Sequence, residues 1–153
     1  MSELVKMINQ KNIVFFDEPV NLDKEQLLEK LACRLFQNGY VKESYIQAIQ
    51  EREAVFPTGL NTTTYGIAIP HTDSKHVYEA TIALGIVKTP VSFQEMGAEE
   101  VEVPVRLVFM LAIKEPEKQL ETLQAVISLI EDEGKMQALV QVADEAAVLQ
   151  QLN

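Results

Sequence analysis

Both histidines of this 153-residue chain, His71 and His76, lie in the stretch GIAIPHTDSKH, residues 66–76. His71 follows Pro70, whose ring fixes its own φ and removes a backbone donor, so that a strand ladder would stop there. A neutral imidazole, with an unperturbed pKa of about 6.5, offers one ring nitrogen as nucleophile, base or ligand. The sequence therefore predicts an imidazole presented on a stiff support at a strand end. The alternative is a hydrogen-bonded histidine without chemistry.

A metal site is the second chemistry to consider, because His71, Asp73 and His76 form the pattern H-x-D-x-x-H. That spacing matches no familiar site, and no cysteine or third ligand lies nearby to complete a tetrahedral set. We therefore expect no metal, and we expect His76 to be a solvent-exposed loop histidine. No Walker loop, dinucleotide glycine pattern or kinase signature occurs, so no cofactor is expected either.

Two cations lie near His71 in the sequence, Arg52 and Lys75. An arginine that faces an imidazole carrying a phosphoryl group would offer two parallel N–H donors to the phosphoryl oxygens. The alternative is that Arg52 belongs only to a surface charge pattern within residues 50–53.

The segment before His71 predicts the element that positions it. TTTYGIAI, residues 62–69, has the period of a strand, and FPTGLN, residues 56–61, contains turn formers. Gly66 and Ala68 share one face of that strand, which indicates that another element approaches closely.

Two helices are expected before this region. Leu and Phe side chains at helical spacing predict a helix from Asp23 to Gly39, with Asp23 and Gln26 as a capping box and Gly39 as a left-handed cap. The lone cysteine, Cys33, lies in this pattern and is expected to be buried. A second helix is expected over Glu43–Ala54.

The rest of the chain predicts further strands and then helices. Strands are expected at the apolar run Ile13–Phe16, at Ala80–Val87 and at Val101–Ile113, with a hairpin or short edge strand over residues 87–94. A helical stripe follows, broken at Gly134, and a shorter helical pair ends the chain. The stripe comprises Leu120, Leu123, Val126, Ile127 and Ile130. Together these elements predict one α/β domain over residues 1–153, with a mixed central β-sheet flanked by helices.

Composition limits the partners. The chain has 23 acidic and 13 basic residues and a formal net charge of -10, which argues against nucleic acid and against an anionic membrane surface. No window approaches the roughly 20 apolar residues of a spanning helix, and the N-terminus has no cleavage pattern. We expect a soluble, cytoplasmic protein without membrane insertion, and its start at Met1 and its end near a helix terminus favour a free-standing one.

Residues 51–77, EREAVFPTGLNTTTYGIAIPHTDSKHV, resemble the active-site region of the fructose/mannitol-type enzyme IIA domains of the bacterial phosphoenolpyruvate-dependent sugar phosphotransferase system. That family shows an Arg-Glu pair, a Thr-Gly turn and a G-x-A-x-P-H signature. The matching residues are Arg52, Glu53, Thr58, Gly59, Gly66, Ala68, Pro70 and His71. The resemblance extends to the strand LVFMLAI and to the helix start at residues 119–123.

The resemblance implies a phosphoryl relay. Phospho-HPr would donate its phosphoryl group to His71, which would pass it to a IIB component and, through IIC, to an entering sugar. Arg52 would stabilise the phosphoryl group, and Thr58 of the Thr-Gly turn is a candidate substrate contact. Transfer between two carriers tolerates little misplacement of the imidazole. The restricted backbone at Pro70 would therefore help to position His71.

One position departs from the pattern. Many relatives carry a second active-site histidine where this chain has Gln119, and a glutamine can donate a hydrogen bond but cannot gain charge. This glutamine resembles the galactitol-type branch, which implies galactitol or a related polyol as the substrate. Two alternatives stay open: a regulatory protein like the nitrogen-type enzyme IIA, in which the phosphorylation state controls partners, and a non-phosphorylatable binding domain.

Overall fold

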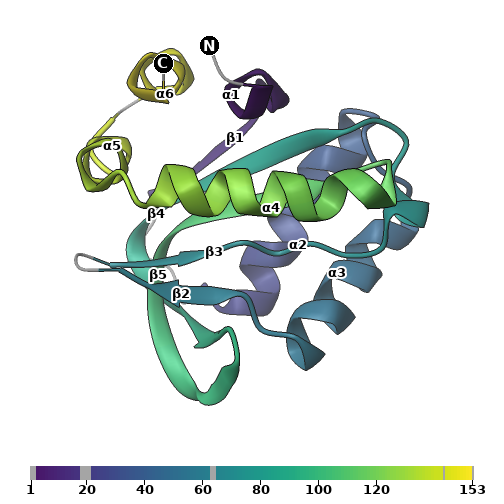
Figure 1. Cartoon of the computed structure of the whole chain (residues 1–153), viewed down its shortest axis with the longest axis horizontal. Helices are drawn as coiled ribbons and strands as arrows, with labels where there is room; N and C mark the ends of the chain where they lie inside the picture. Colours follow the sequence, from purple (N-terminus) through teal and green to yellow (C-terminus); the bar gives the residue numbers. More distant parts are fainter. Residues whose placement is uncertain (1–2, 18–21, 63–64, 143, 153) are drawn as a thin grey trace.

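The computed structural model describes residues 3–17, 22–62, 65–142 and 144–152, and a sheet forms its middle layer (Figure 1). Five strands of the described chain form this sheet, in the order β1-β4-β2-β3-β5 with an additional pairing of β4 and β5. They are β1 (Ile8–Phe16), β2 (Gly59–Asn61), β3 (Gly66–Ala68), β4 (Thr81–Glu95) and β5 (Ala98–Ala112). The β1–β4 and β3–β5 pairs are parallel and the β2–β3 and β4–β5 pairs antiparallel, so the predicted mixed sheet is confirmed.

Helices cover both faces of the sheet, which confirms the predicted α/β class. In Figure 1, α2 and α3 lie behind the sheet and α4 crosses in front of it. The helices are α1 (Glu3–Met7), α2 (Lys24–Gln37), α3 (Ser44–Val55), α4 (Pro116–Ile130), α5 (Glu133–Leu139) and α6 (Glu145–Leu152), with a short 3-10 helix, η1 (Ser74–His76). None of the described helices is long and apolar enough to cross a membrane.

Strand β5 separates two hydrophobic cores. Successive side chains of a strand point to opposite faces, so Leu107 and Phe109 pack into one core and Val108 and Met110 into the other. The first core is closed by α4, α5 and α6, and the second by α2 and α3. This burial on both faces explains the nearly continuous apolar run that predicted the strand.

The caps of α2 are as predicted. The Asp23 side chain accepts a hydrogen bond from the Gln26 backbone, the Gln26 side chain accepts one from the Asp23 backbone, and Gly39 has a φ of 82°. The expectation that Cys33 is buried is wrong, because its exposure is intermediate.

Strand bounds differ from the prediction where pairing is long-range. Residues 56–61 contain β2 as well as a turn, because Gly59 to Asn61 pair with β3. The predicted strand over residues 62–69 is shorter, β3 covering only Gly66–Ala68, and residues 63–64 lie outside the described chain. Strand β4 continues through the expected hairpin segment to Glu95, and the turn lies at Gly97, whose φ is 79°.

The N- and C-terminal elements also need correction. Strand β1 begins at Ile8, five residues before the apolar run, and α1 precedes it. Leu120 was expected on the buried stripe of α4 but is 62% exposed. The break after α4 falls at Glu131 and Asp132, and Gly134 lies inside α5.

The close approach predicted at Gly66 is confirmed. A Cβ at this position would overlap the Val103 side chain and lie 2.7 Å from the Pro104 carbonyl oxygen of β5. Strand β3 therefore lies tightly against β5 at Gly66, four residues before Pro70.

Candidate active site

The backbone of His71 is held by β5. Beyond the end of β3, His71 makes an isolated parallel bridge with Leu111, and the Leu111 N–H donates to the Pro70 carbonyl at 2.9 Å. The Leu111 carbonyl in turn accepts from the buried Tyr45 hydroxyl of α3 at 2.7 Å. These bonds join the His71 loop to both the sheet and α3, so the predicted stiff support is present.

A single hydrogen bond sets the state of the imidazole ring. His71 Nδ1 lies 2.8 Å from the Ile69 carbonyl oxygen. Because a carbonyl oxygen only accepts, the proton of the neutral ring lies on Nδ1 and the lone pair on Nε2. Burial lowers the pKa of His71, and the Arg52 cation lowers it further, while the Ile69 bond opposes both effects. The half-buried ring is therefore neutral at neutral pH.

An open pocket surrounds the ring. It is lined by Arg52, His71, Thr72, Asp73, Ser74, Pro116 and Gln119. The pocket thus combines the end of α3, the histidine loop and the start of α4, which lie far apart in the sequence. Pro116 is the first residue of α4, so the N-terminal end of that helix, which is the positive end of its dipole, lies at the pocket wall, where it favours an anion.

Arg52 supplies the cation of the pocket. It is exposed in the last turn of α3, and its guanidinium carbon lies 4.3 Å from the centre of the Phe56 ring. No salt bridge of Arg52 occurs within the described ranges. Lys75 is also exposed, but it does not line the pocket.

Gln119 connects α4 to the histidine loop. Its side-chain Nε2 donates to the Thr72 carbonyl at 3.0 Å, and its Oε1 is buried without a hydrogen-bond partner in the described structure. The sequence prediction that Gln119 belongs with His71 and Arg52 agrees with this shared pocket.

Thr58 lies elsewhere. It is 3% exposed and absent from the pocket lining, so it does not sit where a substrate contact would be made. Instead it bonds to Glu53, which is 2% exposed and was only part of the sequence motif. The signal for Glu53 was its place on the buried side of α3, four residues after Ile49, where a carboxylate is unusual.

His76 lies outside this pocket. Its Nδ1 is 2.8 Å from the Ser44 hydroxyl at the start of α3, and the ring is half-buried, so it is not the freely exposed loop residue that was expected. In the part of the chain that is described, no three histidine, cysteine or acidic side chains cluster as metal ligands.

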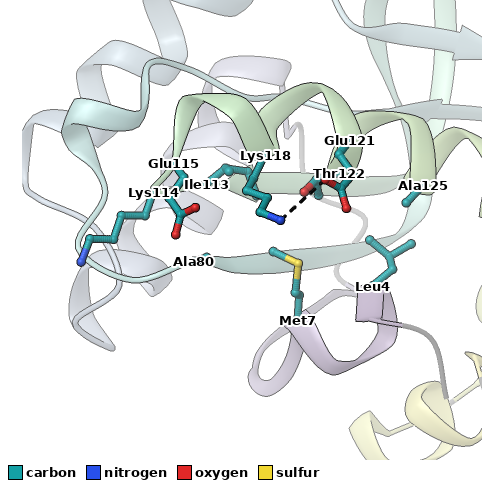
Figure 2. A pocket seen from close by; sticks show the side chains of 10 residues that line it. All are labelled: Leu4, Met7, Ala80, Ile113, Lys114, Glu115, Lys118, Glu121, Thr122 and Ala125. Atoms are coloured by element: carbon teal, nitrogen blue, oxygen red, sulfur yellow. Dashed lines mark ion pairs between the residues drawn. The ribbon is translucent and has the colours of Figure 1, made fainter.

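A second hollow lies between α1 and α4 (Figure 2). Leu4, Met7 and Ala125 give it apolar walls, and Lys118 and Glu121 form an exposed ion pair of 3.8 Å at its rim. Its lining contains neither His71 nor Arg52, so it is separate from the His71 pocket.

The fold and the pocket define a class of protein. This α/β domain presents a neutral imidazole with a free Nε2 beside an arginine and a helix N-terminus. The imidazole nitrogen can act as a nucleophile, and the arginine and the helix end can stabilise an anionic group during its transfer. The chain belongs to the family described as phosphoenolpyruvate-dependent sugar phosphotransferase system, EIIA 2, whose model matches residues 7–153. The resemblance found in the sequence is thereby confirmed.

Individual relatives agree with this family. The galactitol-specific EIIA component of Escherichia coli K12 is 29% identical over 119 residues, covering 78% of this chain and 79% of that protein. The transcriptional regulator ManR of Bacillus subtilis is 37% identical over 95 residues, covering 62% of this chain and 13% of that protein.

A solved structure agrees with the fold. The enzyme IIA of the mannitol system of Escherichia coli, in complex with phosphorylated enzyme IIB, has a TM-score of 0.77 at 24% identity, covering 95% of this chain and 96% of that one.

Proposed function

We propose that this protein is a phosphocarrier that accepts a phosphoryl group from phospho-HPr on His71 Nε2 and passes it to a IIB component. The carrying observation is the hydrogen bond of 2.8 Å between Nδ1 and the Ile69 carbonyl, which leaves Nε2 unprotonated in a pocket beside Arg52. A neutral nitrogen lone pair is what attack on phosphorus requires.

The chemistry balances without a proton acceptor. The His71 Nε2 lone pair forms a bond to phosphorus while the phosphorus–nitrogen bond of phospho-HPr breaks and its electron pair returns to the donor imidazole. The Nδ1 proton of His71 stays in place, so the phosphorylated ring carries a positive charge that the Ile69 carbonyl stabilises. The same charge makes the ring a good leaving group when a IIB nucleophile attacks the phosphorus.

The rest of the pocket would stabilise the transferring group. Arg52 can donate two N–H bonds to phosphoryl oxygens, and the start of α4 adds a favourable dipole. Gln119 keeps one amide hydrogen for a phosphoryl oxygen when the other is bound to Thr72. Because it stays neutral, Gln119 would hold the group without supplying charge.

We infer galactitol or a related polyol as the carbohydrate finally phosphorylated, because a galactitol-specific relative covers most of the chain and because Gln119 stands at the second-histidine position. The relay would operate on the cytoplasmic side of a IIC transporter. A regulatory role is the second candidate, supported by the relative that is a transcriptional regulator.

Phosphorylation with purified components tests the proposal. Protein incubated with phosphoenolpyruvate, enzyme I and HPr should gain one acid-labile phosphoryl group by intact mass, His71→Ala should gain none, and His76→Ala should match the wild type. Subsequent loss of the group to a galactitol IIB domain would separate transport from regulation. Labelling that survives in His71→Ala, or a wild type that takes up no phosphate, would refute the assignment.

A further inference from the structure

A buried carboxylate behind the pocket has no part in the mechanism described so far. Glu53 follows Arg52 in α3 but is only 2% exposed. Burying a carboxylate is costly unless hydrogen bonds compensate it. Both carboxylate oxygens are used: Oε2 accepts from the Thr58 backbone N–H at 2.7 Å, and Oε1 accepts from the Thr58 hydroxyl at 2.8 Å.

These bonds fix the direction of the Thr58 hydroxyl. Because its hydrogen points at Glu53, its oxygen is free to accept, and the Ile69 N–H donates to it at 3.2 Å. The same N–H also lies 3.3 Å from the Thr58 carbonyl. Thr58 thereby holds residue 69 through two acceptors, one of which depends on Glu53.

Ile69 is the residue whose carbonyl holds His71 Nδ1 at 2.8 Å. Its N–H end is bonded to Thr58 and its carbonyl end leads into Pro70, whose φ is fixed. A continuous series of hydrogen bonds and covalent bonds therefore runs from the Glu53 carboxylate through Thr58 and Ile69 to the imidazole.

We propose that Glu53 is a positioning residue that, through the Thr58 hydroxyl and the Ile69 peptide groups, holds the His71 ring in the form with its proton on Nδ1. The consequence for phosphotransfer rests on the proposed function, whereas the consequence for the ring proton does not. This gives the second residue of the Arg-Glu pair, and Thr58 of the Thr-Gly turn, a shared task behind the pocket.

Glu53→Gln is the direct test, because it keeps the shape and changes the hydrogen bonding. An amide that accepts from the Thr58 N–H must turn its NH2 group to the Thr58 hydroxyl, which then can no longer donate to residue 53. Imidazole nitrogen shifts in 15N-labelled protein report the proton position, and only two rings contribute because the chain has two histidines.

In the wild type we expect His71 to carry its proton on Nδ1. In Glu53→Gln we expect a shift of population towards Nε2–H and a roughly tenfold slower phosphorylation, as for other groups that orient a functional histidine. Glu51→Gln is the matched control, since it removes the same charge from an exposed position on α3. It should change neither the position of the His71 ring proton nor the rate of phosphorylation.

A second pair of variants keeps the test decisive if Glu53→Gln does not fold. Thr58→Val removes the hydroxyl and should reproduce the shift in ring proton, whereas Thr58→Ser keeps the hydroxyl and should restore the wild-type spectrum. Wild-type nitrogen shifts for His71 in Glu53→Gln or in Thr58→Val would overturn the proposal. Failure of the wild type to accept phosphate would instead refute the proposed function and leave the spectral test intact.

Discussion

At the scale of single residues, the pocket depends on how two titratable groups are buried. His71 is kept neutral by burial and by Arg52, so its Nε2 is available without deprotonation by a base. The pKa of Glu53 shifts in the opposite direction. Burial raises this pKa from 4.5 to about 7, although the Thr58 hydrogen bonds and Lys24 act to lower it. Burial therefore disfavours the charged form of both groups, and for Glu53 the two hydrogen bonds from Thr58 compensate part of that cost.

The raised pKa of Glu53 predicts a specific pH dependence of stability. Between pH 4.5 and about 7 the folded protein binds a proton that the unfolded chain has already released. The contribution of Glu53 to the free energy of unfolding is therefore largest below this window, and it declines as pH rises, by on the order of 3 kcal/mol. Above the folded-state pKa the contribution is constant.

Urea unfolding of the wild type and of Glu53→Gln from pH 4.5 to 8 measures this effect. The wild type should lose stability relative to the variant as pH rises, because the amide does not titrate. Glu51→Gln, exposed on the same helix, should give a curve parallel to the wild type. Parallel curves for Glu53→Gln as well would mean that Glu53 titrates normally in the folded protein.

The sequence predicted the residues of the pocket better than the residues behind it. His71, Arg52 and Gln119 could be brought together by motif resemblance, because each has a chemical type that the proposed relay needs. Glu53 and Thr58 were in the same motif, but their hydrogen bonds connect the end of α3 to the strand before His71 through the interior. Hydrogen bonds of this kind depend on how α3 packs against the strand, and the residue types of Glu53 and Thr58 do not predict that packing.

At the scale of elements, local signals were reliable and long-range ones were not. The capping box at Asp23 specifies the start of α2 by bonds within four residues, so the sequence contained all the information needed. Strand β2 has only three residues, and they form a strand because they pair with β3 and β4. Their residue types favour a turn, so the sequence did not predict this strand. Leu120 fitted the helical period of the buried stripe, but α4 turns it to solvent.

The contact of β3 with β5 leads to a prediction at this scale. Gly66→Ala would place a Cβ 2.7 Å from the Pro104 carbonyl oxygen and against Val103, and the backbone must shift to relieve the overlap. We expect a loss of about 1 to 3 kcal/mol in the free energy of unfolding, as for other overpacked sites. Denaturant unfolding measures the loss.

Gly134→Ala is the matched control for that experiment. Its new Cβ would meet only Asp132 Oδ1, at 3.6 Å, and alanine favours the helical conformation of α5. This variant should be as stable as the wild type or up to about 1 kcal/mol more stable. If Gly66→Ala unfolds like the control, β3 and β5 are less tightly packed than the structure indicates.

At the scale of the whole molecule, the proposed relay requires one small surface to bind two protein partners in turn. The net charge of -10 gives no general attraction for a phosphorylated donor, so docking near His71 must rely on local groups. Exposed apolar side chains lie next to two pocket residues. Phe56, whose ring centre is 4.3 Å from the Arg52 guanidinium carbon, is 55% exposed, and Leu120, which follows Gln119 directly, is 62% exposed. An apolar margin around a charged pocket is suited to binding proteins in turn.

Leu120→Asp tests this margin. Because the side chain is 62% exposed, the substitution should leave the melting temperature nearly unchanged. It should nevertheless raise the KM for phospho-HPr by about tenfold, since an apolar contact is replaced by a charge that must be desolvated on docking. The steady-state rate of phosphorylation against phospho-HPr concentration gives this value.

Val101→Asp is the comparison for Leu120→Asp, because Val101 is also exposed but lies in the β4–β5 hairpin, which projects at the bottom of Figure 1 away from α4. The KM of Val101→Asp for phospho-HPr should equal that of the wild type. An equal rise in both variants would assign the effect to net charge, and no rise in either would exclude Leu120 from the docking surface. A rise for Leu120→Asp alone would show that the α4 side of the pocket binds the donor.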